Sequence, residues 1–138
     1  MSSESAGDGT LVFDSSAFVA ILRNEPDADD LLKRALTYRR CVMAAPTWLE
    51  TAIVCESKYV TVGDLLDQLA GKLQIEVLPF TAAQAAIARQ AYRQFGKGRG
   101  QRGSLNFGDC FAYALAKDIG APLLFKGNDF NLTDVTVA

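Results

Sequence analysis

Four carboxylate residues stand beside short apolar stretches that are spread along the chain: Asp14, Glu50, Asp109 and Asp129. The sequence contains no histidine, so imidazole is excluded as a general base, as a metal ligand and as the partner of a nucleophile. Carboxylate oxygens are ligands that hard divalent cations prefer. Dispersed acids that a fold can gather therefore predict a Mg²⁺ or Mn²⁺ site.

The segments that must position these acids alternate between strands and helices. Strands are expected at Thr10–Phe13, Cys41–Ala45, Ile75–Leu78 and Pro122–Phe125, with a possible fifth at Asp134–Val137. Helices are expected at Asp14–Leu22, Asp27–Arg40, Pro46–Tyr59, Val62–Leu73, Thr81–Phe95 (packing through Ala85, Ile87, Ala88 and Ala91) and, capped by Ser104 or Asn106, up to Ile119. This alternation implies parallel strands and right-handed crossovers. The predicted fold is an α/β, three-layer α/β/α sandwich with a central, mainly parallel sheet of four to five strands.

The predicted fold brings the four acids to one rim. Asp14 directly follows the first strand, and Asp129 follows the strand at 122–125 by a few residues. Ligand sites of open α/β sheets lie beyond the carboxyl ends of the strands. Glu50 and Asp109 are expected in the first turns of helices that begin at this rim. Carboxylates that meet there raise one another's pKa unless a cation neutralises them.

Each acid taken alone also has a purely structural interpretation. Asp14 is suited to cap a helix, Glu50 and Asp109 complement helix dipoles, and Asn128-Asp129 is typical of a turn. These interpretations do not explain why all four stand at one rim. Two further acids are weaker candidates: we expect Asp118 on a solvated face and Asp134 in a turn or behind the site.

Several stretches resemble a known family. They are Phe13-Asp14-Ser15-Ser16-Ala17 with Arg23-Asn24-Glu25-Pro26, then Glu50, then the stretch from Leu105 to Ala116, and finally Leu123 to Phe130. Together they resemble the PIN domain and, more narrowly, the VapC toxins of bacterial toxin–antitoxin pairs. The resemblance runs from about residue 10 to the C-terminus, and Asn106–Ala116 is its most specific part.

The resemblance implies a Mg²⁺-dependent endoribonuclease that hydrolyses RNA phosphodiester bonds, with tRNA or rRNA as the substrate. Asp14, Glu50, Asp109 and Asp129 match the family's acidic quartet, and Ser16 matches its small hydroxyl residue. Asp14, Asp109 and Asp129 would hold the Mg²⁺, for which Mn²⁺ can substitute, and cleavage would leave 5′-phosphate and 3′-hydroxyl ends. The implied partners are a VapB-type antitoxin and a second copy of the chain.

The loop before the most specific stretch departs from the family. Related toxins commonly carry a His-Pro pair where this chain has Gly98-Arg99-Gly100-Gln101-Arg102-Gly103. These letters also satisfy the dinucleotide pattern G-x-G-x-x-G, but that pattern works only after a strand, and a helix is expected here. We interpret Lys97, Arg99 and Arg102, flanked by Arg89 and Arg93, as a basic lip for RNA phosphates; the alternative is a solvated flexible loop.

Composition limits the remaining possibilities. With 138 residues, 49% hydrophobic content and a net charge of −2, we expect a loose N-terminal tail over residues 1–9 and one domain over 10–138. Three cysteines without ligand spacing predict buried, reduced thiols. No apolar run is long enough to span a membrane and no leader segment is evident, so a cytoplasmic protein is expected.

Two functions of other classes remain open. One is a catalytically idle interaction protein, and the other is an aspartyl-phosphate signalling domain, which Ser15-Ser16 after Asp14 disfavours because such domains place adjacent acids there. An antitoxin would lay an amphipathic segment along apolar grooves between the early helices. Phe18 and Trp48 would either line such a groove or, as we favour, pack in the core.

Overall fold

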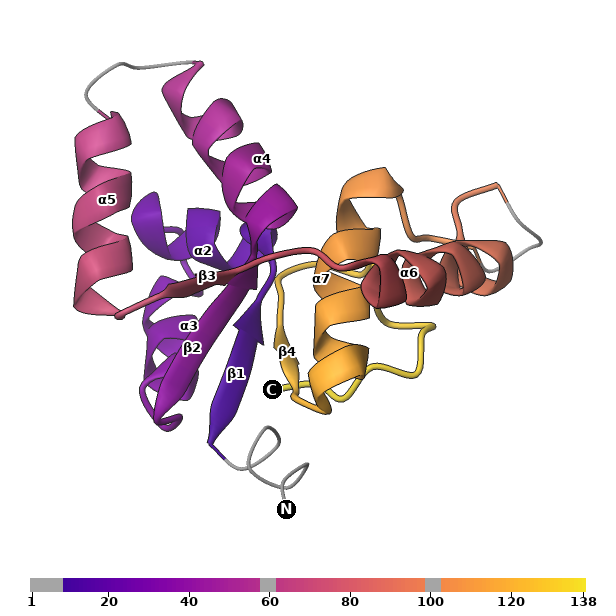
Figure 1. The fold of residues 1–138 in the computed structure, drawn as a ribbon. Helices are drawn as coiled ribbons and strands as arrows, with labels where there is room; N and C mark the ends of the chain where they lie inside the picture. The colour runs from indigo at the N-terminus through magenta and orange to yellow at the C-terminus, as the bar shows by residue number, and fades with distance from the viewer. Residues whose placement is uncertain (1–8, 58–61, 99–102) are drawn as a thin grey trace.

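The computed structural model describes residues 9–57, 62–98 and 103–138 (Figure 1). Apart from Gly9, the expected N-terminal tail lies outside these residues. The Gly9 carbonyl accepts a hydrogen bond from the Arg40 N–H at 2.9 Å, so the described chain begins at the sheet. None of the helices in the described ranges is long and apolar enough to cross a membrane.

A four-stranded sheet forms the middle layer of the molecule. Its strands are β1 (Thr10–Phe13), β2 (Arg40–Ala44), β3 (Glu76–Leu78) and β4 (Leu123–Leu124), in the spatial order β3-β2-β1-β4. All neighbouring strands are parallel, as predicted. The possible fifth strand is reduced to a single bridge between Leu123 and Val137, in which the Leu123 N–H donates to the Thr136 carbonyl at 2.8 Å and the Leu123 carbonyl accepts from the Ala138 N–H at 3.0 Å.

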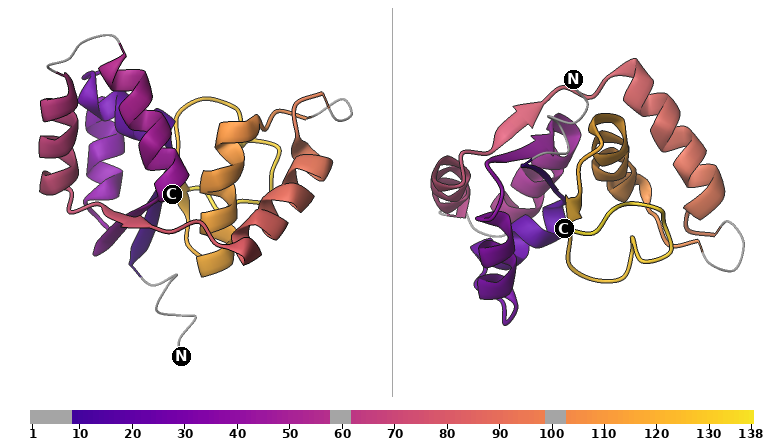
Figure 2. Two further views of the ribbon diagram at one scale, coloured as in Figure 1. Left: turned by 45° about the horizontal axis from the view of Figure 1, so that its top comes forward. Right: turned by 90° about the horizontal axis from the view of Figure 1, so that it is seen from below.

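Helices cover both faces of the sheet (Figure 2). One face is covered by α2 (Ser15–Leu22), α3 (Ala28–Ala35), α4 (Ala45–Glu56) and α5 (Val62–Lys72), and the other by α6 (Ala82–Phe95) and α7 (Phe107–Ile119). Alternate strand residues serve the two cores: Leu11 and Phe13 face α2, whereas Val12 faces α7. Both faces are apolar because a parallel sheet is buried on both sides. The predicted three-layer sandwich is confirmed.

Several helix boundaries and faces differ from the prediction. Helix α3 ends at Ala35 rather than near Arg40, because the Thr37 hydroxyl closes its last turn on the Arg34 carbonyl and Arg40 joins the sheet. Ala85 is exposed rather than packed. Its neighbour Gln84 is buried instead, with its amide donating to the Asp118 carboxylate at 3.1 Å.

The three cysteines are distributed over different elements. Cys41 lies on β2, Cys55 on α4 and Cys110 on α7, and all three are buried and free. Burial raises the pKa of each thiol, to about 11 for Cys110. The prediction of buried cysteines is confirmed, and none of the three forms a disulfide.

Candidate active site

The register of the sheet fixes the rim at which the acids gather. Phe13 pairs with Leu124 across β1 and β4, and the next residue, Asp14, donates its N–H to the Leu124 carbonyl at 3.0 Å. The segments that follow β1 and β4 therefore leave the sheet at the same edge. That edge is the carboxyl end of the parallel strands, as expected for a ligand site.

Asp14 is buried, with 3% of its surface exposed, and it caps α2. Its Oδ2 accepts hydrogen bonds from the Ser16 N–H at 3.1 Å and from the Ser16 hydroxyl at 2.6 Å. The Ser16 Oγ in turn accepts from the Lys126 N–H at 3.0 Å. Ser16 thus links the first acid to the segment that follows β4, and Asp14 is both a helix cap and a rim residue.

Asp109 is held by reciprocal hydrogen bonds at the start of α7. Its N–H donates to the Asn106 side-chain oxygen at 2.9 Å, and its carboxylate accepts from the Asn106 N–H at 3.0 Å. This capping box satisfies two N–H groups that a helix start leaves without partners. Asp109 is only 7% exposed, so the helix cap also fixes a buried acid at the rim. Asn106 rather than Ser104 is the N-cap.

Glu50 reaches the rim from α4. It lies in the second turn rather than the first, because α4 begins at Ala45. Its carboxylate lies against Gly108 so closely that a Cβ atom built on that glycine would be 2.4 Å from the Glu50 Oε2. A glycine beside Asp109 therefore leaves the space that the Glu50 carboxylate occupies.

Asp129 belongs to the loop that follows β4 and is exposed. The loop turns at Gly127, whose φ of +96° lies in the region that favours glycine, and it is anchored by the buried Phe130. The Ser104 hydroxyl donates to the Asp129 carbonyl at 2.6 Å. This contact joins the loop to the segment that enters α7.

The four acids influence one another's pKa through their charges. Burial raises the pKa of Asp14, hydrogen bonds from Ser16 oppose the rise, and the charge of Glu50 adds to it. Burial also raises the pKa of Asp109, which reaches about 7. The hydrogen bond from Asn106 lowers this pKa, whereas the charges of Asp14 and Asp129 and a hydrogen bond to Asp129 raise it further. The rim therefore disfavours the fully ionised state of its own acids.

The four carboxylates are the kind of ligands that a hard divalent cation prefers, but they do not surround one point in this structure. Within the described ranges, no three acidic or thiol side chains form a cluster that could hold an ion as they stand. Glu50 and Asp129 are exposed, whereas Asp14 and Asp109 are buried and held by hydrogen bonds from Ser16 and Asn106. Ligand sets made only of oxygen atoms are suited to Mg²⁺ or Mn²⁺. The buried surroundings of Asp14 and Asp109 penalise their negative charge, which a bound cation would neutralise.

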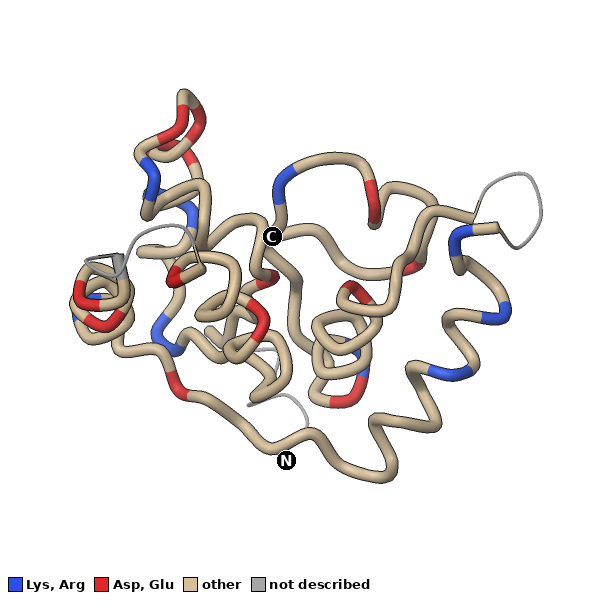
Figure 3. Tube along the Cα trace, turned by 90° about the horizontal axis from the view of Figure 1, so that it is seen from above, with Lys and Arg blue, Asp and Glu red and all other residues tan. Residues whose placement is uncertain are grey.

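The described basic residues of the expected lip lie on α6 and just after it. Arg89 and Arg93 are exposed on α6 and Lys97 directly after it, and Figure 3 shows the basic positions of α6 along the outer edge of the molecule. Arg99 and Arg102 lie outside the described residues. Because a helix precedes Gly98, the structural context required for a dinucleotide-binding turn is missing.

The contacts of two polar residues around the site were not found from the sequence. Lys126 forms ion pairs with Glu25 at 2.5 Å and Asp27 at 3.2 Å, which tie the segment after β4 to the connection between α2 and α3. Ser104 contacts Asp129 across 25 positions of the chain. Contacts between residues so far apart have no local sequence signal. Asp134, by contrast, accepts hydrogen bonds from Tyr113 and Lys117 on α7, and its charge is not among those that raise the pKa of Asp14 or Asp109.

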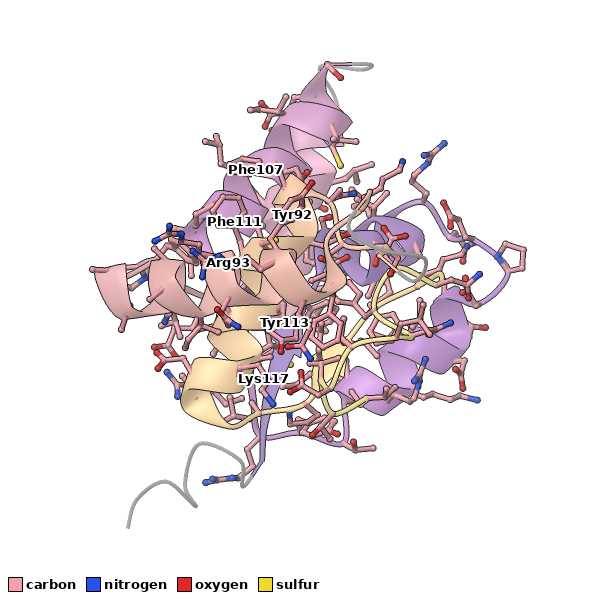
Figure 4. All side chains as sticks on the ribbon, turned by 90° about the vertical axis from the view of Figure 1, so that its right-hand side faces the viewer. Tyr92, Arg93, Phe107, Phe111, Tyr113 and Lys117 are labelled. Atoms are coloured by element: carbon pink, nitrogen blue, oxygen red, sulfur yellow. The ribbon has the colours of Figure 1, made fainter. Side chains whose placement is uncertain are left out.

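Apolar hollows flank the acidic rim. A hollow of about 320 Å³ lies beside Glu50, and one of about 420 Å³ lies on the α6 side of α7. Phe107 and Phe111 line both; Phe107 is 78% exposed, and Figure 4 shows the two rings near Tyr92 of α6. Phe18, by contrast, is buried and packs edge-on against Trp48 at 5.9 Å, as favoured for these two residues.

Comparisons with known proteins agree with this fold. The PIN domain model matches residues 11–135. The chain is 48% identical over 126 residues to a protein named Ribonuclease VapC from Mycolicibacterium smegmatis, covering 91% of this chain and 97% of the relative. The chain belongs to the PIN-domain family, and within it to the VapC group.

Solved structures show the same architecture at low sequence identity. VapBC2 from Rickettsia felis, described as bound to a DNA fragment from its promoter, gives a TM-score of 0.75 at 13% identity, covering 94% of this chain and 97% of that one. VapC20 from Mycobacterium tuberculosis, described as a toxin that cleaves the sarcin–ricin loop, gives 0.69 at 14% identity, covering 93% and 98%. At these identities the likeness concerns the fold.

Proposed function

We propose that the protein is a Mg²⁺-dependent endoribonuclease that acts as the toxin of a toxin–antitoxin pair in the cytoplasm. The observation that carries the proposal is the position of Asp14, Glu50, Asp109 and Asp129 at one rim of a PIN fold, coupled to one another in pairs. The names of the relatives, which are ribonucleases at up to 48% identity, support the reaction class. Two apolar cores that share one sheet support a single domain over residues 10–138.

The acids have separate roles in this proposal. Asp14, Asp109 and Asp129 hold the ion, and Glu50 ligates it directly or through water. Ser16 orients the Asp14 carboxylate through its hydroxyl. When bound, a Mg²⁺ or Mn²⁺ ion supplies a nucleophilic water at neutral pH and neutralises charge on the phosphate oxygens. Ionisation of Asp109, which burial disfavours, is what prepares the site for the cation.

The substrate is proposed to be a structured RNA, tRNA or rRNA. Lys97, Arg99 and Arg102, with Arg89 and Arg93 beside them, would contact phosphates while the acids act on the scissile one. Sequence-specific proteins usually read the single-stranded loops of such RNAs. A sarcin–ricin loop fragment is one useful probe, since one structural neighbour is described as cleaving that loop.

The proposed partners are a VapB-type antitoxin and a second copy of the chain. One structural neighbour, from Klebsiella pneumoniae, is described as a toxin–antitoxin complex and three others as VapBC, which supports the first. A hollow of about 190 Å³ between α2 and α5, lined by leucines together with Gln68 and Lys72, suits an amphipathic segment of the antitoxin. The face formed by α4 and Phe107 suits the second copy, because it gathers large exposed apolar side chains.

One other function is favoured by a specific observation. The absence of a three-carboxylate cluster in the described part of the chain, together with the exposed apolar face, is what a catalytically idle interaction protein would show. An aspartyl-phosphate signalling domain is less well supported, since Ser15 and Ser16 follow Asp14.

RNA cleavage by the purified, partner-free protein tests the proposal. Total tRNA, rRNA and the sarcin–ricin fragment are incubated with Mg²⁺, Mn²⁺ or EDTA, beside the Asp109→Asn variant. Discrete cuts with 5′-phosphate ends that require metal and disappear in the variant are expected. Metal-independent cutting, or equal cutting by the variant, contradicts the proposal. A folded protein that cuts none of these RNAs and binds no Mn²⁺ favours the idle alternative.

A further inference from the structure

Ser104 connects two elements that each carry one acid of the rim. Its hydroxyl donates to the main-chain carbonyl of Asp129 at 2.6 Å. Ser104 stands two residues before Asn106, the N-cap that holds Asp109. One side chain thus spans the gap between the start of α7 and the loop after β4, where Asp109 and Asp129 meet.

The backbone from which this hydroxyl projects is well fixed. The N–H groups of Ser104 and of the buried Leu105 both donate to the Phe95 carbonyl, at 2.8 and 2.9 Å. The Lys97 N–H donates to the Leu105 carbonyl at 2.6 Å. Ser104 is therefore held against the end of α6 independently of its contact with Asp129.

The loop that receives the hydrogen bond has weaker support of its own. Asn128 and Asn131 bond to each other, by side chains at 2.8 Å and by main chain at 3.2 Å, within the loop. Phe130 anchors one end in the core. The Asp129 carboxylate is exposed, so its position depends on how the main chain of this loop is held.

We propose that Ser104 is a positioning residue for Asp129. Its hydroxyl fixes the main chain of Asp129 and thereby keeps the carboxylate within reach of the cation that Asp109 binds. Groups that orient metal ligands typically change metal affinity or activity 10- to 100-fold when they are removed. The inference rests on the proposed function in one respect, namely that Asp129 is a metal ligand.

Direct binding of Mn²⁺, measured by electron paramagnetic resonance, tests this role without RNA. The variants are Ser104→Ala, Ser104→Thr and Asp129→Asn, with melting temperatures recorded for each. Ser104→Ala is expected to weaken Mn²⁺ binding about 10-fold, and Ser104→Thr to bind like the wild type because it keeps a hydroxyl. Ser57→Ala is the matched control, since it removes a serine-to-carbonyl hydrogen bond, to Val54 at 3.1 Å, on α4; it should leave binding unchanged.

A double-mutant cycle separates positioning from simple loss of stability. Once Asp129→Asn has removed the ligand, adding Ser104→Ala should weaken Mn²⁺ binding no further. If Ser104→Ala does not fold, Ser104→Cys replaces it, because a thiol is a weaker donor, and intermediate affinity is expected.

The outcomes distinguish this proposal from the proposed function. Wild-type affinity in Ser104→Ala or Ser104→Cys, together with weakened binding in Asp129→Asn, overturns the role of Ser104 and leaves the metal site intact. An equal further loss when Ser104→Ala is added to Asp129→Asn also overturns it. A wild-type protein that binds no Mn²⁺ overturns the metal site itself, and the role of Ser104 with it.

Discussion

Asp14 and Asp109 are the two acids of the rim whose side chains are held in one position. Both are buried at the rim and both are fixed by hydrogen bonds, to Ser16 and Asn106. An asparagine at either position keeps the size of the side chain and can still accept these bonds through its amide oxygen. It removes the negative charge that a cation requires.

Asp14→Asn and Asp109→Asn are therefore each expected to lower RNA cleavage at least ~100-fold, since a metal contributes several kcal/mol to such reactions. Circular dichroism should show an unchanged fold. Asp67→Asn, which alters an exposed acid on α5, is the control and should cleave like the wild type. Full activity in either rim variant would remove that acid from the site.

The raised pKa values also predict how stability depends on pH. An aspartate of the unfolded chain titrates near pH 4, whereas the pKa of Asp109 is about 7 in the folded protein. Between these values the folded state binds more protons than the unfolded state. The free energy of unfolding therefore decreases as the pH rises through this window, and the raised pKa of Asp14 acts in the same direction.

Melting temperatures measured in EDTA should accordingly fall between pH 5 and pH 8. Asp109→Asn should show a shallower fall and should melt several degrees above the wild type at pH 8, because ~1 kcal/mol corresponds to about 4 °C for a chain of this size. Saturating Mg²⁺ should restore much of the wild-type loss. Identical pH profiles for the two proteins would show that Asp109 titrates normally.

At the scale of elements, α7 is placed by its contact with α4. Gly108 in its first turn is in contact with the Glu50 carboxylate, and glycine is the least favourable residue for a helix after proline. Gly108→Ala should stabilise α7 by up to about 1 kcal/mol through helix propensity, but its Cβ displaces the end of the Glu50 side chain.

We expect Gly108→Ala to keep or raise the melting temperature while cleavage falls about 10-fold. Gly71→Ala in α5 is the matched control, because a Cβ there meets no atom within 4 Å; it should raise stability and leave cleavage unchanged. Equal cleavage by both variants would mean that the position of Glu50 is not critical.

Elements with strong local signals could be predicted from the sequence, and those defined by distant contacts could not. Helix α7 is bounded by Asn106 and Gly120, whose cap functions are local. The end of α3 differs from the prediction, since the residues up to Arg40 suit a helix locally and only the pairing of Arg40 with Thr10 of β1 places it in the sheet. Likewise, the positions of aspartate and glutamate residues relative to the strand ends predicted the acidic rim. They did not predict the contacts of Ser104 and Lys126, whose partners are distant in the sequence.

At the scale of the whole molecule, one surface is more apolar than a solvated monomer requires. Leu49, Ile53 and Val54 of α4 and Phe107 of α7 are all exposed and line or border the hollow beside Glu50. A contiguous apolar face of this kind usually marks an interface. The proposed second copy would cover it.

Ile53→Glu is therefore expected to shift the protein from dimer to monomer in light scattering after size-exclusion chromatography. Ile53 is 58% exposed, so the change buries no charge in the monomer, and its melting behaviour at low concentration should be little affected. Leu36→Glu, at a residue that is 66% exposed at the end of α3, is the control and should remain dimeric. Dimers of the Ile53 variant would place the interface elsewhere.

The positions of the three thiols allow local opening of the native protein to be measured without an engineered label. Cys41, Cys55 and Cys110 are buried in β2, α4 and α7 and form no disulfide, so an alkylating reagent reaches each thiol faster when its element separates from the core. Labelling rates followed by mass spectrometry would thus give an opening free energy for each element in one native sample. Because Cys110 follows Asp109 directly, its alkylation should also become slower when a bound cation stabilises the start of α7.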